Sequence, residues 1–154
     1  MVSVLFVCLG NICRSPMAEA VLRHQLREQG LDKKVQVDSA GTGNWHAGKP
    51  PHQGTRSLLA DRGISDKGIK ARQIVEKDLI DFDYVITMDN SNYQDVKNMV
   101  DREVDIHRFV DFIPGTAYKE IPDPYFTGNF EETYRLVEAG CREIIQTLRE
   151  KEEL

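Results

Sequence analysis

A cysteine and an arginine near the start of the chain, Cys8 and Arg14, could carry out chemistry as a pair. Between them lie Gly10 and Asn11, the residue types that most readily adopt left-handed backbone conformations, which lets successive N–H groups turn toward one anion. A thiolate is a strong nucleophile, and a guanidinium binds two phosphate oxygens at once. The spacing therefore predicts a phosphate-binding loop in which Cys8 attacks phosphorus and Arg14 holds the phosphate.

The residues on either side of this loop favour the same interpretation. The apolar run 3–8 predicts a strand that leads into the loop. After the loop, Ser15 is a favoured helix cap and Pro16 suits the first helical position, so a helix is expected to begin there. The free N–H groups and the dipole of a helix N-terminus attract phosphate and stabilise a thiolate. The alternative is a structural turn with a buried cysteine.

A proton donor for the leaving group is the second requirement of such a reaction, and Asp123 is the best candidate. Pro122 and Pro124 restrict the backbone around it, which places the carboxyl group on a stiff loop. Protonated, the group could deliver a proton to the leaving oxygen; deprotonated, it could activate water. Asp-Pro pairs are also common in plain turns, so the residues alone do not decide between a catalytic Asp123 and a purely structural turn.

The rest of the chain alternates between predicted strands and predicted helices. Apolar, β-branched runs predict strands at 3–8, 35–38, 84–88 and 106–109, and amphipathic patterns predict helices at 16–29, 54–62, 92–100 and 130–149. This order favours one α/β domain over residues 1–154, with a parallel, twisted sheet. Ligands bind beyond the carboxyl ends of the strands in such sheets, which is where the Cys8 loop is expected.

Composition limits the surroundings and partners of the protein. With 154 residues, of which 40% are hydrophobic, the chain can bury one sizeable core. It has no apolar run long enough to cross a membrane, and its three cysteines fit free thiols in a reducing compartment, so we expect a cytoplasmic location. The net charge of −5 argues against binding to nucleic acid or anionic membranes. The four histidines show no metal-ligand spacing with the cysteines, so no metal site is expected.

These motifs resemble those of the low-molecular-weight protein tyrosine phosphatase family. Residues 7–19 match the family's N-terminal signature and 123–125 its acid loop, while 38–42, 70–73 and 83–89 are similar to further family segments. The resemblance implies a four-stranded parallel sheet with helices on both faces. It also implies hydrolysis of phosphotyrosine through a cysteinyl-phosphate intermediate, without metal or cofactor. We expect a monomer that acts on a phosphotyrosine-containing protein.

The resemblance also assigns roles to individual residues. It implies that Cys8 is the nucleophile, Arg14 the phosphate ligand, and Asp123 the general acid and then the general base. The expected phosphate-binding loop comprises Leu9, Gly10, Asn11, Ile12, Cys13 and Ser15. The implied pocket walls are Leu9, Ile12, Trp45, Tyr125 and Phe126, which form an apolar slot that suits a flat aryl phosphate. Trp45 could instead anchor its own Gly/Pro-rich loop.

Supporting roles are implied for the residues around the nucleophile. Ser15 is expected to hydrogen-bond the Cys8 sulfur, and Asn11, bonded to Ser39, is expected to hold the strained shape of the loop. Ile69 stands where eukaryotic relatives often carry a histidine that supports this asparagine.

The other two cysteines have simpler interpretations. The resemblance implies that Cys13 could trap an oxidised Cys8 as a reversible disulfide. The alternative is that Cys13 serves only as a small apolar side chain of the loop. Cys141, on the apolar face of the last predicted helix, is interpreted as a core residue.

Three other functions compete with this interpretation. Arsenate reductases of the same fold use a further cysteine pair, and residues 82–95, where relatives carry that pair, contain none. Protein-arginine phosphatases carry threonine at the position of Ile12, and an apolar, β-branched side chain favours an aromatic neighbour over a guanidinium. A phosphocysteine carrier would need neither Arg14 nor Asp123.

Overall fold

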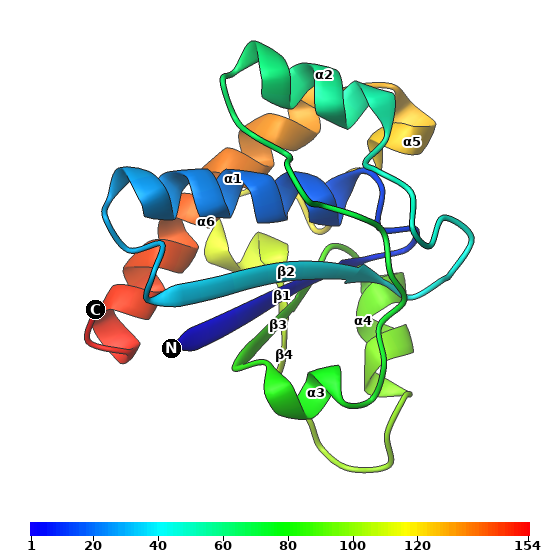
Figure 1. Ribbon diagram of the computed structural model, residues 1–154. Helices are drawn as coiled ribbons and strands as arrows, with labels where there is room; N and C mark the ends of the chain where they lie inside the picture. The colour runs from blue at the N-terminus through cyan, green and yellow to red at the C-terminus, as the bar shows by residue number, and fades with distance from the viewer.

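The structure of the protein, a computed structural model that describes residues 1–154, is built on a four-stranded sheet in the order β2-β1-β3-β4 (Figure 1). All three strand pairings are parallel. The strands are β1 (Val2–Cys8), β2 (Val35–Gly41), β3 (Tyr84–Thr87) and β4 (Ile106–Arg108). The prediction of a four-stranded parallel α/β sheet is confirmed.

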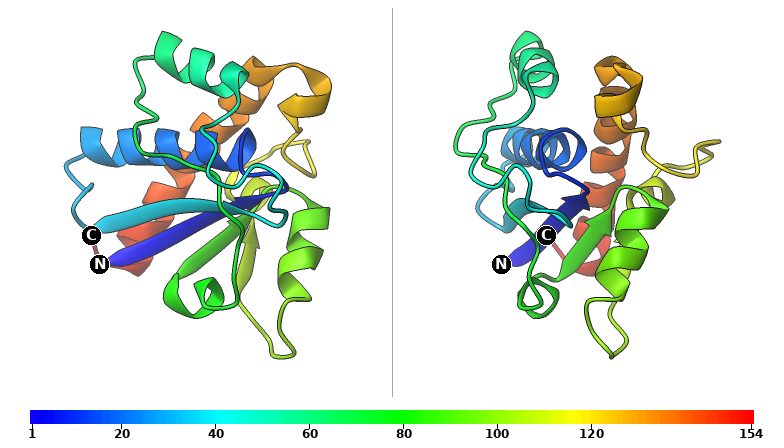
Figure 2. Two further views of the ribbon diagram at one scale, coloured as in Figure 1. Left: turned by 45° about the vertical axis from the view of Figure 1, so that its right-hand side comes forward. Right: turned by 90° about the vertical axis from the view of Figure 1, so that its right-hand side faces the viewer.

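Helices cover both faces of this sheet. The helices are α1 (Arg14–Glu28), α2 (Gln53–Asp61), α3 (Asp78–Asp81), α4 (Asn90–Lys97), α5 (Pro124–Thr127) and α6 (Phe130–Lys151), with a 3₁₀ turn, η1, at Phe109–Phe112. Helices α1 and α6 pack together on one face, and α3 and α4 lie on the other (Figures 1 and 2). Helix α2 lies against α1 and α6, close to the start of α1.

Strand β1 is buried on both sides because its side chains alternate between two cores. Val4, Phe6 and Cys8 belong to a core of 26 buried residues under α1 and α6. Leu5 and Val7 belong to a core of 7 buried residues under α3 and α4. The central strand therefore fixes the position of Cys8 at the carboxyl end of the sheet.

Two predicted boundaries differ for reasons that bear on the site. Helix α1 begins at Arg14 with Cys13 as its cap residue, and Ser15 makes no cap hydrogen bond. The prediction that Ser15 caps the helix was wrong, because its hydroxyl is used by the neighbouring loop atoms described below. Strand β2 continues beyond its predicted end at residue 38 to Gly41, because it pairs with β1 as far as Cys8.

The remaining predicted elements shift by a few residues at their ends. The short segments α3, α5 and η1 were not predicted, since none is long enough to show a helical periodicity.

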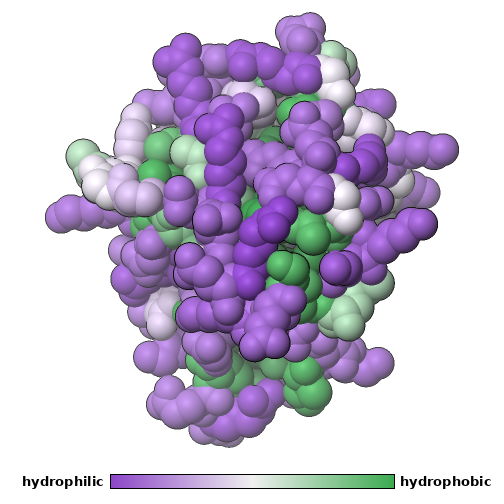
Figure 3. Space-filling view, turned by 90° about the vertical axis from the view of Figure 1, so that its left-hand side faces the viewer, coloured by the Kyte–Doolittle hydropathy of each residue, from purple (hydrophilic) through white to green (hydrophobic).

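The two ends of the chain lie together at the amino ends of the strands. Val2 and Leu154 both pack against the larger core, and the N- and C-termini are near each other in Figures 1 and 2. The same end, seen in Figure 3, carries mostly hydrophilic side chains with smaller hydrophobic groups between them. No helix in the structure combines the length and hydrophobicity needed to span a membrane.

Candidate active site

The loop after β1 wraps around the sulfur of Cys8. The backbone N–H of Asn11 donates a hydrogen bond to Cys8 Sγ at 3.3 Å, and Ser15 Oγ lies 2.9 Å from the same atom. Asn11 has a φ of 57°, in the left-handed region that few residues other than glycine adopt. This conformation turns the Asn11 N–H inward, so the strain of the loop serves contact with the sulfur.

The Asn11 side chain fixes this shape through three further hydrogen bonds. Its Nδ2 donates to Ser15 Oγ at 2.8 Å and to Ser39 Oγ at 2.9 Å, while its Oδ1 accepts from the Arg72 N–H at 2.9 Å. Since Ser15 Oγ accepts from Asn11, its own hydrogen is free to point at Cys8 Sγ. Ser15 is thus arranged to donate to a thiolate. Ile69, noted above, lies in the core, and a backbone N–H supports the asparagine instead.

The hydrogen-bond chain continues from Ser39 into helix α1. Ser39 Oγ donates to Glu19 Oε1 at 2.6 Å, and Arg23 forms an ion pair with the other carboxylate oxygen. Burial raises the pKa of Glu19 to about 7, although the Ser39 hydrogen bond and Arg23 oppose the shift. A network of hydrogen bonds therefore runs from the half-exposed Arg23 through the buried Glu19 and Ser39 toward the Cys8 sulfur.

Arg14, at the start of α1, is 2% exposed and points to the same pocket. One terminal nitrogen binds Asp89 Oδ2 at 2.8 Å and the Ile121 carbonyl at 3.0 Å. The other lies 3.4 Å from Asp123 Oδ2, and the buried Nε has no partner. Burial acts to lower the pKa of Arg14, but the charges of Cys8, Asp123 and Asp89 outweigh it and raise that pKa. The edge of the guanidinium formed by Nε and the second terminal nitrogen is suited to two oxygens of an anion.

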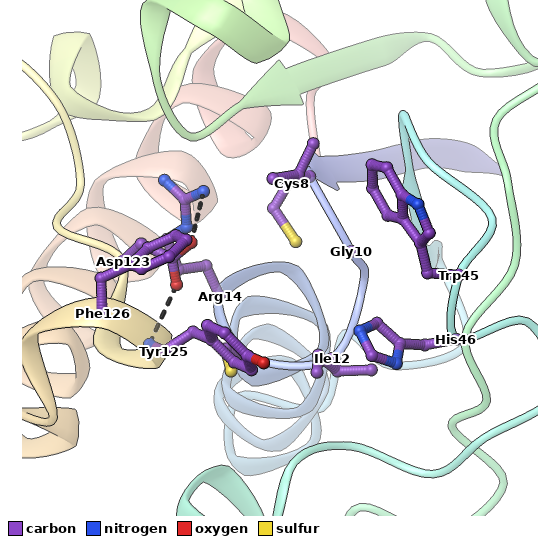
Figure 4. Close-up of a pocket in the computed structure, with 11 residues that line it drawn as sticks. Cys8, Gly10, Ile12, Arg14, Trp45, His46, Asp123, Tyr125 and Phe126 are labelled. Atoms are coloured by element: carbon purple, nitrogen blue, oxygen red, sulfur yellow. Dashed lines mark hydrogen bonds and ion pairs between the residues drawn. The ribbon is translucent and has the colours of Figure 1, made fainter.

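Asp123 is the N-cap of the short helix α5. Its Oδ1 accepts from the Tyr125 N–H at 3.1 Å, and its Oδ2 faces Arg14 (Figure 4). Pro124 occupies the first turn of α5, and the Pro122 carbonyl accepts from Thr133 Oγ1 at 3.1 Å. Asp123 thus forms part of a turn and also lines the pocket. A structural role in the turn and an acid–base role at the pocket are therefore compatible.

A pocket of about 240 Å³ opens above the loop. Figure 4 shows Arg14, Asp123 and Phe126 on one side of Cys8, and Trp45 and His46 on the other. Three rim side chains are largely exposed: Trp45 by 65%, Tyr125 by 56% and Phe126 by 75%. The lining residues are Cys8, Leu9, Gly10, Ile12, Cys13, Arg14, Trp45, His46, Asp123, Tyr125 and Phe126.

Trp45 lies at the pocket and also over its own loop. A side-chain carbon at Gly43 would collide with the Trp45 ring. Trp45 is therefore in position both to line the pocket and to anchor its own loop.

Helix α2 supports the loop from outside. The His52 N–H donates to the Ile12 carbonyl at 2.7 Å, and Thr55 Oγ1 donates to the Cys13 carbonyl at 3.2 Å. Cys13 is buried beside them, and burial, followed by the charges of Asp123 and Cys8, raises the pKa of its thiol to about 12.

All three cysteines are free thiols. Cys141 is fully buried, and burial raises the pKa of its thiol as well. No three histidine, cysteine or acidic side chains are grouped so that they could hold a metal ion.

The structure brings the predicted residues together in two layers. Cys8, Arg14, Asp123 and the three aromatic residues line the pocket. Asn11, Ser15 and Ser39 lie beneath it, within the hydrogen-bond network.

Sequence reasoning missed Glu19, Arg72, His46 and Asp89 as parts of the site. Asp89 follows β3 and caps α4, so an acid at the carboxyl end of a parallel strand was a usable signal. Glu19 occurs on a buried helix face, where an acidic residue was a second signal. Nothing in the sequence marked His46.

Comparisons with known proteins match the whole chain. The model of the family described as low molecular weight phosphotyrosine protein phosphatase matches residues 3–154. The low molecular weight protein-tyrosine-phosphatase YfkJ of Bacillus subtilis is 47% identical over 156 residues, which cover 100% of both chains. Its crystal structure has a TM-score of 0.95 and covers 98% of this chain and 96% of that one.

Two further solved structures resemble this fold at lower identity. A protein tyrosine phosphatase from Entamoeba histolytica has a TM-score of 0.92 and 35% identity, with 99% of each chain covered. An arginine phosphatase from Drosophila has a TM-score of 0.87 and 34% identity, with 95% of this chain and 97% of that one covered. Together with the full-length sequence match, these likenesses show that the chain belongs to the low molecular weight phosphotyrosine protein phosphatase family.

Proposed function

We propose that this protein hydrolyses phosphotyrosine in protein substrates, with Cys8 as the nucleophile. The observation that carries the proposal is the arrangement around one sulfur atom. Cys8 Sγ is held by the Asn11 N–H and the Ser15 hydroxyl at the base of a pocket that Arg14 and Asp123 also line. Two hydrogen-bonding groups and a nearby guanidinium thus surround the atom that would attack phosphorus.

In the first step the Cys8 thiolate attacks phosphorus, and the bond between phosphorus and the tyrosine oxygen breaks. The Arg14 edge and the inward N–H groups of the loop hold the phosphoryl oxygens through this step. Asp123, protonated in the enzyme–substrate complex, gives its proton to the leaving tyrosine oxygen. The products of the step are a free tyrosine hydroxyl and a phosphocysteine.

In the second step a water molecule attacks the phosphocysteine. The Asp123 carboxylate takes a proton from that water, the phosphorus–sulfur bond breaks, and inorganic phosphate is released. The Ser15 hydroxyl donates a hydrogen bond to the departing sulfur, which stabilises the thiolate leaving group. Cys8 and Asp123 act in both steps, and at the end the enzyme has returned to its starting state.

The shape of the pocket supports an aryl phosphate as the substrate. Ile12 and the aromatic side chains Trp45, Tyr125 and Phe126 form walls above the sulfur, and a flat ring fits between such walls. Phosphoserine has no ring to fill the space between these walls, so we expect it to be a poorer substrate. Because the Drosophila structure is that of an arginine phosphatase, hydrolysis of phosphoarginine is the alternative activity to test. The apolar Ile12 in the pocket lining favours the aromatic substrate.

The surroundings of the enzyme are part of the same proposal. Three free thiols suit the reducing cytoplasm, and a net charge of −5 suits an enzyme that binds neither nucleic acid nor anionic membrane. A monomer is sufficient, because every proposed catalytic group comes from one chain.

The test is hydrolysis of para-nitrophenyl phosphate and of a phosphotyrosine peptide in the presence of a metal chelator. We expect Cys8→Ser to abolish turnover of both. Asp123→Ala should lower kcat for the peptide by about 10²–10⁴-fold, and less for para-nitrophenyl phosphate, whose leaving group needs little protonation. A phosphoarginine peptide is the comparison substrate, and its faster turnover would overturn the assignment of phosphotyrosine.

A further inference from the structure

A second pocket, called here the side pocket, adjoins the catalytic pocket. It has a volume of about 430 Å³ and shares Leu9 and Trp45 with the catalytic pocket. Trp45 lies on the side of Cys8 away from Asp123, so the side pocket extends the site in that direction (Figure 4). It is lined by Leu9, Thr42, Gly43, Asn44, Trp45, Gln73, Ile74, Asp95 and Met99.

Backbone hydrogen bonds build the side pocket before any ligand binds. The Thr42 and Gly43 N–H groups donate to the Cys8 and Leu9 carbonyls, each at 2.9 Å, which holds the shared wall on the end of β1. The Ile74 N–H donates to the Gly41 carbonyl at 2.8 Å, which fixes the base of the pocket on the end of β2. A preformed pocket binds a ligand with a smaller loss of conformational entropy than a mobile surface does.

The chemistry of the lining selects a cation on an apolar stem. Leu9, Trp45, Ile74 and Met99 provide apolar surface, and Asp95 is the one ionisable side chain in the lining. The Asp95 carboxylate makes no ion pair or hydrogen bond within the chain. Lysine and arginine side chains match this combination, since their methylene stems pack on apolar surface while the charged end reaches a carboxylate.

We propose that the side pocket binds a lysine or arginine side chain of the substrate close to the phosphotyrosine. This inference rests on the proposed phosphotyrosine activity and adds to it a preference for basic neighbours. An extended peptide advances about 3.3 Å per residue, so a residue within about two positions of the phosphotyrosine reaches the adjoining pocket. Arginine is preferred over lysine because its guanidinium also stacks on the exposed Trp45 ring.

The test compares phosphotyrosine peptides that differ at one position, with arginine, alanine or glutamate at each of the positions nearest the phosphotyrosine. At one of them we expect kcat/KM to be about three- to tenfold higher with arginine than with alanine, and lowest with glutamate. The preference should weaken as ionic strength rises, because exposed charges are screened. Asp95→Lys should reverse the order of the arginine and glutamate peptides.

Matched controls separate this inference from the proposed function. Asp101→Lys makes the same charge change at an acid that lies outside the side pocket, and it should keep the arginine preference. Both variants should hydrolyse para-nitrophenyl phosphate as the wild type does. Equal kcat/KM for all the peptides, or a reversal with Asp101→Lys as well, would overturn the side-pocket inference alone. Failure of the wild type to hydrolyse any of these phosphate esters would overturn the phosphatase proposal and this inference with it.

Discussion

The base and the rim of the catalytic pocket are built in opposite ways. The base consists of Cys8, Asn11, Arg14, Ser15 and Ser39, which are all buried. Cys8 and Ser15 bond to each other and to Asn11 within the loop, whereas Asn11, Arg14 and Ser39 also bind partners from other segments. These distant partners include Asp89 and the Arg72 N–H. The rim consists of Trp45, Tyr125 and Phe126, which are largely exposed. Tyr125 packs against Phe126 and His52, and Trp45 lies over Gly43.

This difference teaches where each property of the enzyme resides. A side chain with many buried partners keeps one position, which nucleophilic attack and transition-state binding require. An exposed aromatic side chain adds contact area and tolerates change at small cost in stability. We therefore expect changes in the base to affect the reaction itself, and changes in the rim to affect which substrates bind.

Breaking the base at Arg14, the proposed phosphate ligand, should give the largest effect. Arg14→Lys keeps the positive charge but removes the planar pair of donors, including the buried Nε. We expect kcat/KM for para-nitrophenyl phosphate to fall by about 10³-fold. Arg27→Lys, a matched change at an exposed position of the same helix, should stay within about threefold of the wild type. A loss of less than tenfold for Arg14→Lys would contradict the proposed role of the planar guanidinium in holding phosphate.

The buried carboxyl group of Glu19, beneath the base of the pocket, should make the stability of the protein depend on pH. Its pKa is about 7 in the folded protein against an ordinary value of 4.5, so the native state retains a proton that the unfolded chain releases between these values. The corresponding stability is complete below pH 4.5 and is lost as the pH rises to about 7. A shift of this size corresponds to about 3 kcal/mol.

Urea unfolding at a series of pH values checks this prediction. Relative to Glu19→Gln, whose side chain does not titrate, the free energy of unfolding of the wild type should decrease by about 3 kcal/mol between these limits. Glu28→Gln, at an exposed position of the same helix, should follow the wild-type curve. Parallel curves for the wild type and Glu19→Gln would show that the carboxyl group does not titrate in this range.

Breaking the rim should give the smallest effect. Phe126 is 75% exposed, so Phe126→Ala removes little buried area. We expect kcat to stay unchanged and KM for para-nitrophenyl phosphate to rise by at most about threefold. Ile80→Ala, at an exposed site away from the pocket, is the control for nonspecific loss of stability. A drop in kcat of more than tenfold would move Phe126 from the rim into the group that positions the reaction.

The base of the pocket could be predicted from the sequence because much of it is local. Strand, loop and helix start follow one another within a few residues, so Cys8, Asn11 and Arg14 showed their chemistry through spacing. The continuous apolar run from Val4 to Val7 also predicted the strand that leads into the loop. Ser15 shows the limit of local reasoning, since its hydroxyl serves the sulfur and the Asn11 amide instead of capping the helix.

Contacts between distant segments could not be predicted in this way. Arg14 binds Asp89 across 75 positions of the chain, and the Arg72 N–H reaches Asn11 across 61. Such pairs depend on how crossovers place the carboxyl ends of parallel strands side by side. His46 likewise lines the pocket only because its loop folds back over Gly10.

The position of the chain ends has a practical consequence. Both termini lie at the amino ends of the strands, whereas Cys8 and its loop lie at the carboxyl end of β1 (Figure 1). A tag, surface anchor or recruiting module fused to either terminus would extend away from the catalytic mouth. Joining the termini through a short linker would also permit circular permutation, with new ends opened at a loop remote from the catalytic groups. The fold is therefore well suited to immobilisation and to targeted delivery of its activity.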